Sequence, residues 1–242
     1  MVIIILGLII LYILKISPSK TKYKDSAYKE SSGNPFSQTV FNKGNYGEFL
    51  TFTELEKLSG YNILMTNLYI PKDNGSTTEI DVLMITETGI YVFESKNYSG
   101  WIFGDQKNKT WTQSLANKQK NRFYNPILQN YGHISALKSV LSIHDEEMYR
   151  SFIIFSERCE LKNITITSDH VHVLKRNDLF HTVRRGMLES EKRMTYNEID
   201  TIYQTLKKYT LVSEQVKKDH IKSISQRATD REITETQRVN TN

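Results

Sequence analysis

Runs of apolar residues, and of alternating apolar and polar residues, divide the first half of the chain into one helix and several strands. Apolar residues recur at helical spacing from Tyr46 to Leu58, and Gly60 follows as a stop signal. Strand patterns bounded by turn residues then occur at residues 63–70, 80–86, 90–95, 100–104 and 109–113. Because the first three strands are consecutive, we expect them to pair antiparallel. The last two predict a short hairpin.

The second half of the chain alternates between helices and short apolar strands. Its longest helical pattern begins at Asn125-Pro126, with proline tolerated in the first turn, and reaches Leu141. The apolar run at Phe152–Phe155 follows this helix, so we expect a crossover to a parallel strand. The remaining predicted elements are a strand at residues 171–174, a helix capped by Asn177-Asp178 that ends near Leu188, and a helix opened by the capping box Thr195–Glu198.

This order of elements predicts an α/β fold in which helices flank a mixed β-sheet. Two polar segments are expected to lie outside it. Residues 17–42 have no apolar periodicity and predict a flexible stalk. Residues 213–242 have few large apolar residues and charges of both signs, which predicts a charged, disordered tail.

The N-terminus is the most apolar part of the chain. Residues 2–14 are apolar apart from Gly7 and Tyr12, and four lysines follow within ten residues. As a helix, residues 2–16 would span roughly 22 Å, short of the ~30 Å hydrocarbon core of a bilayer, a gap that snorkelling of Lys15 or bilayer thinning would close. We predict a transmembrane signal anchor at residues 1–16, which would make this a single-pass protein of the cell membrane with its domain on the cytoplasmic side.

Two other interpretations of the N-terminus were weighed. A cleaved signal peptide would need a basic region before the apolar run and a small-x-small cleavage site after it, and neither is present. A buried N-terminal helix would be expected to carry a polar face, which this segment lacks.

Composition narrows the possibilities only slightly. The chain has 242 residues, enough for one domain with a good core plus appendages. Its net charge of +5 and pI near 9.0 are compatible with a polyanionic partner and too mild to establish one. The single cysteine, Cys159, excludes an internal disulfide and a cysteine-based zinc site.

The candidate chemistry lies at the end of the third predicted strand, where charged residues stand in a pattern that predicts burial. Along an extended strand, Glu94 and Lys96 point to the same face, and in the preceding strand Glu79 and Asp81 do so as well. With the appropriate register, Asp81 lies beside Glu94. Burying such charges requires partners or a bound cation.

Paired carboxylates and a lysine predict metal-dependent hydrolysis of a phosphodiester. Two adjacent carboxylates repel unless a cation lies between them, and Mg²⁺ or Mn²⁺ accepts oxygen ligands of this kind. Lys96 could orient or deprotonate the attacking water and stabilise charge on a phosphate. The alternative for Glu94 and Lys96 is an exposed salt bridge at a strand end. Glu48, at the start of the first helix, could support the metal or simply interact with the helix dipole.

Several ordered motifs together resemble the NERD (nuclease-related) domain, a family assigned to the PD-(D/E)XK nuclease superfamily. They are Gly44–Glu48, Glu79–Leu83, Gly89–Lys96, Gly100–Gly104, and Asn125–Gln129 with His133. Ile80 stands where the superfamily's name has proline, which is usual in NERD sequences. The resemblance covers roughly residues 42–155 and implies a restriction-endonuclease-like fold.

The resemblance also implies a role for each matching residue. Asp81 and Glu94 become metal ligands, Lys96 becomes the catalytic lysine, and Glu48 completes the site as a further acid near the metal. Gln129 matches a helix position close to the active site of related nucleases, and His133 lies one helical turn further on the same face. The expected domain is then residues 43–157, completed by a strand and helices at residues 158–212.

Other candidates for nucleic-acid contacts are less specific. Lys118, Lys120 and Arg122 lie in a polar loop before the long helix and could contact phosphates or simply be solvated. Trp101 and Trp111 could stack on bases, although packing against the domain is more common. The same ambiguity applies to a second basic group, Lys175, Arg176, Arg184 and Arg185.

Two further residue types are interpreted as structural. His170 and His172 alternate on a strand, but no pattern places a third ligand beside them. Cys159 has no base near it in the sequence pattern, so a thiol nucleophile is not expected.

The sequence therefore predicts a membrane-anchored, Mg²⁺- or Mn²⁺-dependent nuclease with DNA as its expected partner. One alternative is a non-catalytic nucleic-acid-binding or scaffold module that keeps the fold. The presence of all four candidate catalytic residues, Glu48, Asp81, Glu94 and Lys96, favours activity. A membrane-anchored interaction protein unrelated to DNA is the third possibility.

Overall fold

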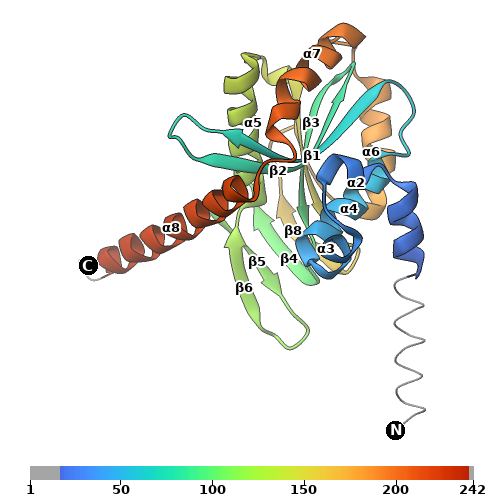
Figure 1. Ribbon diagram of the computed structural model, residues 1–242. Helices are drawn as coiled ribbons and strands as arrows, with labels where there is room; N and C mark the ends of the chain where they lie inside the picture. Colours follow the sequence, from blue (N-terminus) through green and yellow to red (C-terminus); the bar gives the residue numbers. More distant parts are fainter. Residues whose placement is uncertain (1–16, 240–242) are drawn as a thin grey trace, which may run out of the picture.

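A five-stranded sheet forms the centre of the molecule (Figure 1) in a computed structural model that describes residues 17–239. Its strands stand in the order β1-β2-β3-β7-β9. Their bounds are Asn62–Pro71, Thr77–Thr86, Gly89–Lys96, Tyr149–Phe155 and Val171–Lys175, respectively. The first three strands pair antiparallel, and β7 lies parallel to β3, as the crossover pattern predicted. β9 continues the sheet in parallel with β7.

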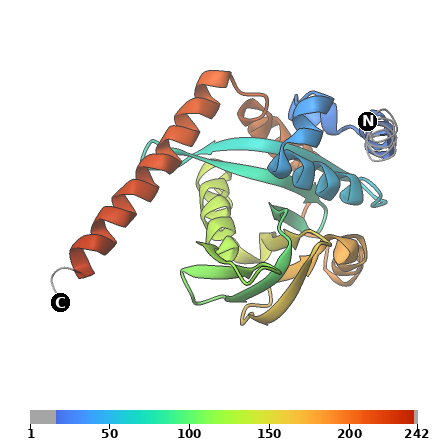
Figure 2. The ribbon, with the colours of Figure 1, turned by 90° about the horizontal axis from the view of Figure 1, so that it is seen from below.

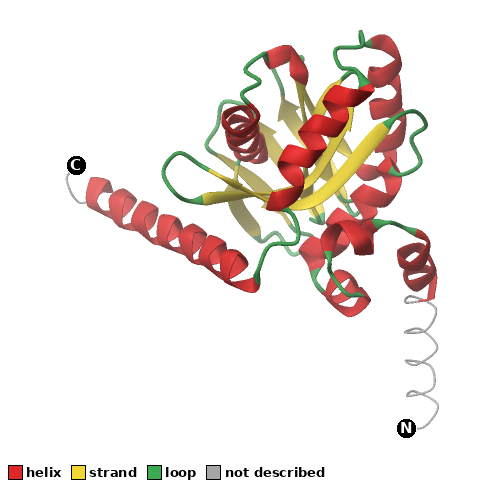
Figure 3. Ribbon diagram, turned by 45° about the horizontal axis from the view of Figure 1, so that its top comes forward, coloured by secondary structure: helices red, strands yellow, loops and turns green. Residues whose placement is uncertain are grey.

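Helices cover both faces of this sheet (Figure 3). On one face, α5 and α7 pack against Leu83 and Val92; on the other, α4 and α6 pack against Val82 and Phe93. Alternate residues of β2 and β3 therefore serve two separate apolar cores. The bounds of these helices are Lys43–Leu55 (α4), Pro126–Leu141 (α5), Arg176–Glu189 (α6) and Tyr196–Leu206 (α7).

A second sheet of four strands lies beside the first (Figure 2), in the order β6-β5-β4-β8. Its strands are Lys120–Tyr124, Thr110–Ser114, Gly100–Asp105 and Cys159–Thr165, respectively. The predicted hairpin is present as β4–β5. The prediction of a single mixed sheet is wrong, because the strands form two sheets. β6 and β8 were missed because each has a polar outer face and few apolar residues, such as Phe123 and Leu161, facing inwards.

Tight packing against one tryptophan joins the two sheets. Trp111 of β5 is 1% exposed and its ring stacks on Phe155 of β7, with centroids 6.2 Å apart and an interplanar angle of 5°. Gly104 of β4 lies directly against the indole, where an added Cβ would come within 2.1 Å of a ring atom. A side chain at residue 104 would therefore push the two sheets apart.

The segment predicted as a flexible stalk is folded against the domain. Residues 17–25 are helical, and α2 (Tyr28–Ser32) and α3 (Phe36–Phe41) follow. Tyr28 is completely buried, with its ring 5.3 Å from that of Phe49 and 5.5 Å from that of Phe52. The stalk prediction is wrong because a few aromatic residues, without helical periodicity, are enough to anchor this segment.

The C-terminal elements correct a second prediction. The capping box of Thr195 and Glu198 opens α7 as predicted, and η2 (Lys207–Tyr209) extends it. The tail predicted as disordered from residue 213 instead forms α8, Glu214–Val239, which projects away from the body of the molecule (Figures 1 and 2). Its first turns contact the sheet, because His220 is only 6% exposed.

The prediction of a single-pass membrane protein is not supported. None of the helices within residues 17–239 combines the length and the apolar character that crossing a bilayer requires. The predicted anchor, residues 1–16, lies outside the described residues. The transmembrane element of the fold prediction, and the cell-membrane location derived from it, are therefore withdrawn.

Candidate active site

The charged residues of β2 and β3 meet where these strands leave the antiparallel ladder. The strand register pairs Val82 with Phe93, and one step further places Asp81 opposite Glu94. A hydrogen bond from the backbone N–H of Ser95 to Oδ2 of Asp81, 2.8 Å long, fixes this arrangement. The two carboxylates that the sequence predicted to be neighbours are therefore adjacent in space.

Glu94 is a buried carboxylate with two partners. Its side chain is 2% exposed, Nζ of Lys96 donates to its Oε1 at 2.5 Å, and Nε2 of His133 lies 2.9 Å from its Oε2. Lys96 itself is 17% exposed. The alternative of a salt bridge in solvent at a strand end is therefore wrong, and both charges require a structural or chemical reason.

The electrostatics of this pair favour full ionisation. Burial would raise the pKa of Glu94, but the charge of Lys96 and the contact with His133 outweigh it, so that the pKa lies below its usual range. Burial would lower the pKa of Lys96, but Glu94 and Asp81 outweigh it and raise that pKa. Lys96 is therefore held as an ammonium ion, which suits it to stabilise negative charge.

Helix α5 supplies two more groups to the site from one face. Asn125 caps the helix by accepting a hydrogen bond from the N–H of Ile127, 2.9 Å away, which fixes where the helix starts. One turn later, Oε1 of Gln129 accepts a hydrogen bond of 3.1 Å from Lys96. His133 follows one turn further and contacts Oγ1 of Thr78 through Nδ1 at 2.8 Å. The structure therefore brings Gln129 and His133 together with Lys96 and Glu94.

The pKa values of Glu48 and Asp81 are shifted upwards, in the opposite direction to that of Glu94. Burial, followed by the charges of Glu79 and Glu94, raises the pKa of Glu48 to about 8. Burial, followed by the charges of Glu94 and Glu48, also raises the pKa of Asp81 well above its usual range. The four carboxylates of Glu48, Glu79, Asp81 and Glu94 thus share a small region with the ammonium ion of Lys96. A bound cation would reduce the repulsion between them.

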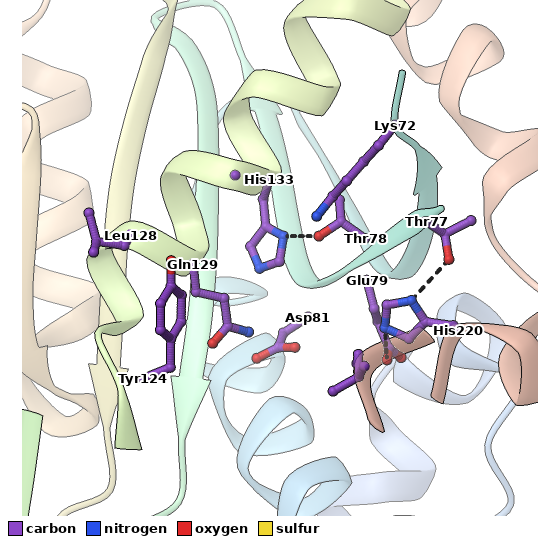
Figure 4. Close-up of a pocket in the computed structure, with 12 residues that line it drawn as sticks. Lys72, Thr77, Thr78, Glu79, Asp81, Tyr124, Leu128, Gln129, His133 and His220 are labelled. Carbon is purple, nitrogen blue, oxygen red and sulfur yellow. Dashed lines mark hydrogen bonds and ion pairs between the residues drawn. The ribbon is translucent and has the colours of Figure 1, made fainter. Parts of the chain in front are cut away.

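A pocket of about 390 Å³ opens beside these carboxylates (Figure 4). Asp81 lies at its floor, with Gln129 and His133 on the α5 side and Tyr124 of β6 next to Gln129. The opposite wall comes from α8, where His220 faces Glu79. The pocket therefore opens Asp81 and Glu79 to solvent, between side chains of α5, β6 and α8.

Sequence reasoning assigned no role to the residues of this far wall. Glu79 accepts a hydrogen bond of 2.5 Å from the hydroxyl of Tyr69, and its Oε2 lies 3.8 Å from Nε2 of His220. Nδ1 of His220 contacts Oγ1 of Thr77 at 2.9 Å. The alternation Glu79-Ile80-Asp81 could have placed Glu79 at the site, but nothing in the sequence brings in a histidine from a segment more than 130 residues away.

The remaining candidates separate into exposed and buried groups. Lys118, Lys120 and Arg122 are all exposed, the first in the β5–β6 turn and the other two on β6. The second basic group does not form one surface, because Arg176 is 2% exposed and pairs with Glu157 at 3.0 Å.

The histidine and cysteine candidates are structural, as interpreted from the sequence. His170 pairs with Glu147 at 3.0 Å, and the ring of His172 stacks on Phe152 with centroids 4.5 Å apart. Cys159 is buried, and burial raises the pKa of its thiol. A thiolate nucleophile is therefore not available at this position.

The carboxylates of the site offer oxygen donors for a metal ion. In the part of the chain that the structure describes, no group of three His, Cys, Asp or Glu side chains forms a ready-made metal cage. Mg²⁺, however, is commonly held by one or two carboxylates, with the rest of its shell supplied by water and substrate phosphate. Oxygen donors at Asp81 and Glu48, whose pKa values are raised by burial and then by neighbouring carboxylates, fit that mode of binding.

The raised pKa of Glu48 predicts how stability depends on pH. The folded protein holds this proton up to about pH 8, whereas an unperturbed glutamate loses it near 4.5, so stability should fall as pH rises through this window. We expect the free energy of unfolding of Glu48→Gln to exceed that of the wild type by about 2 kcal/mol at pH 8.5. This is less than the pKa shift alone would give, because the side chain is partly solvated.

Thermal unfolding without divalent cations, measured between pH 4.5 and 8.5, tests this expectation. The gap between the two proteins should narrow towards pH 4.5, where Glu48 is protonated in the folded state and half protonated in the unfolded state. Glu56→Gln, at the C-terminal cap of the same helix and outside the cluster, serves as the matched control. A gap that stays constant across the range would contradict the electrostatic origin.

Comparison with known proteins gives the family. The family model of the nuclease-related domain, NERD, matches residues 43–156, which include the charged strands and the whole of α5. An uncharacterized protein of Bacillus anthracis is 36% identical over 182 residues, which is 74% of this chain and 82% of the relative. The chain belongs to the NERD family.

The matched NERD segment contains most of the site. Asp81, Glu94, Lys96 and Gln129 all lie within it, whereas His220 of α8 lies outside. Strands β8 and β9 also follow the match, although each pairs within one of the two sheets. No solved structure matches the chain, so the arrangement of the two sheets rests on the structure described here.

Proposed function

We propose that this NERD protein is a metal-dependent nuclease that hydrolyses phosphodiester bonds in DNA. The observation that carries the proposal is the convergence of Asp81, in β2, with Glu94 and Lys96, at the end of β3, where the two strands separate beside an open pocket. Membership of a nuclease-related family supports the same chemistry.

Asp81 and Glu94 would hold a divalent cation, Mg²⁺ or Mn²⁺, with Glu48 supporting it from α4. Bound there, the cation would neutralise the carboxylates, polarise the scissile phosphate and lower the pKa of a water molecule. Asp81 is held by the N–H of Ser95 through only one of its oxygens, so its other oxygen can face the pocket.

Lys96 would stabilise the negative charge that builds up on the phosphate during attack. In the absence of a bound cation, the raised pKa of Lys96 keeps it protonated. A protonated lysine can stabilise negative charge but cannot act as a general base, so the first role is favoured. Gln129 would orient the ammonium through the 3.1 Å hydrogen bond, and His133 would hold Glu94 through the 2.9 Å contact. Neither group needs to touch the substrate to influence the rate.

An incubation of the full chain with labelled single- and double-stranded DNA and RNA tests the proposal. Cleavage is expected with Mg²⁺ or Mn²⁺ and should stop in excess EDTA. Salt-sensitive binding without cleavage under all these conditions would favour the alternative function, a non-catalytic nucleic-acid-binding module. Preferential cleavage of RNA would contradict the choice of DNA.

A further inference from the structure

The chain enters and leaves the second sheet next to residues of the proposed active site. β4 begins four residues after Lys96, and α5 begins two residues after β6 ends. The two site residues on either side of this insertion, Lys96 and Gln129, are joined by a hydrogen bond of 3.1 Å. Strands β4, β5 and β6 therefore start and finish at the proposed catalytic centre.

The two faces of this sheet differ sharply. The inner face carries Trp111, Ile102 and Phe123, which pack against β7 and the start of α5. The strand register places another set of residues together on the outer face, since directly opposed residues share a face. This set, which we call the outer face, comprises Trp101, Phe103, Thr110, Thr112, Ser114, Lys120, Arg122, Tyr124 and Glu160, and Lys162 lies over the Trp101 ring.

The outer face combines exposed aromatic rings with positive charge. Trp101 is 52% exposed and Tyr124 38%. Nζ of Lys162 lies 5.8 Å from the centre of the Trp101 ring and also pairs with Glu160 at 2.8 Å. The side chains of Lys120 and Arg122 are exposed on the neighbouring strand.

The outer face also leads to the pocket. Along β6 the exposed residues alternate, so that Lys120, Arg122 and Tyr124 form a row on one side of the strand. Tyr124 ends this row and lines the same pocket as Asp81 and Gln129 (Figure 4). A polymer lying along the row would therefore arrive at the carboxylates.

We propose that the outer face binds a single-stranded segment of DNA and directs it to the active site. Exposed rings can stack only on bases that are not already stacked in a duplex, and neighbouring lysine and arginine side chains neutralise the backbone. The outer face offers both, on the surface that ends at the pocket. This inference rests on the proposed nuclease function and adds the substrate class, a single strand, to it.

Binding is tested with the full chain and a fluorescently labelled 15-residue oligo(dT), in EDTA so that no cleavage occurs. The double variant Lys120→Ala/Arg122→Ala should bind about 10-fold or more weakly, and the slope of log affinity against log salt should fall by about 1.4. The control double variant Arg184→Ala/Arg185→Ala removes the same charge from exposed positions on α6 and should change affinity less than about 2-fold.

The stacking part of the proposal has its own readout. Trp101 and Trp111 are the two tryptophans of the chain, and only Trp101 is exposed, so quenching of tryptophan emission by oligo(dT) should disappear in Trp101→Phe. Trp101→Ala should weaken binding about 10-fold, whereas Trp101→Phe, which keeps a ring, should retain most of the affinity.

The outcomes separate this inference from the proposed function. Cleavage of long DNA strands should proceed at the wild-type rate in Arg184→Ala/Arg185→Ala and should slow in the outer-face variants, Lys120→Ala/Arg122→Ala and Trp101→Ala. If the wild type cleaves DNA and these variants bind and cleave it equally well, the outer face is not the binding surface. Binding that depends on the outer face without any cleavage would overturn the nuclease function alone.

The choice of nucleic acid has a separate test. Tighter binding of duplex DNA, or of RNA of equal length, would overturn the choice of single-stranded DNA.

Discussion

Lys96→Met is expected to abolish metal-dependent cleavage and to destabilise the fold in the same step. The rate should fall at least about 10³-fold, because the ammonium that stabilises charge on the phosphate is lost. Stability should fall by about 3 kcal/mol, since Glu94 is 2% exposed and loses the partner at 2.5 Å that keeps its pKa low. Single-turnover cleavage and urea unfolding measure the two effects separately.

A matched ion pair on the surface provides the control for Lys96→Met. Lys57 and Glu54 are also 2.5 Å apart, but Lys57 is 53% exposed, so Lys57→Met should cost less than about 1 kcal/mol and leave cleavage unchanged. Lys96→Arg keeps a positive charge and should recover much of the lost stability, but not the rate, because the larger guanidinium cannot repeat the geometry. Equal losses of stability in the Lys57 and Lys96 variants would contradict the importance of burial.

Removing the N-terminal segment is expected to destabilise the domain severely. A chain that begins at residue 43 loses Tyr28, which is fully buried, and Tyr23, which is 6% exposed. Two aromatic side chains of this burial contribute about 4 kcal/mol or more. Urea unfolding of the shortened chain and of the full chain measures the difference.

A point variant isolates the contribution of packing from that of chain length. Tyr28→Ala in the full chain should cost about 3 kcal/mol, because the cavity opens between Phe49 and Phe52. Tyr131→Ala, at a position 37% exposed on α5, should cost less than about 1 kcal/mol. If the shortened chain were as stable as the full one, residues 17–42 would be the dispensable stalk that the sequence predicted.

The sequence predicted those parts of the fold that have strong periodicity. The three antiparallel strands, the long helix after Pro126 and the parallel return at β7 all follow from apolar patterns of sufficient length. The second sheet was predicted only as far as the β4–β5 hairpin, because polar outer residues hide the alternation in β6 and β8. Residues 17–42 were misinterpreted because isolated aromatic residues such as Tyr28 give no periodic signal.

The candidate site shows the same division between local and tertiary information. Strand alternation placed Glu94 with Lys96, and the family resemblance added Gln129 from a helix more than thirty residues later. The far wall of the pocket, with Glu79 and His220, depends on the docking of α8, which no local pattern records. The predicted membrane anchor belongs to a segment outside the described residues, and no helix of residues 17–239 can span a bilayer.

The most direct test of the proposed active site is the rate of DNA cleavage at increasing Mg²⁺ concentrations by the wild type and Asp81→Asn. The substitution keeps the acceptor for the Ser95 N–H and removes only the charge, so the fold should be preserved. Asp73→Asn, in the exposed turn between β1 and β2, is the matched control. We predict a rate that rises to saturation with Mg²⁺ in the wild type and in Asp73→Asn, and a loss of at least about 10³-fold in Asp81→Asn at every concentration. Equal rates in all three proteins, or cleavage that does not depend on the metal, would contradict the assignment of this site.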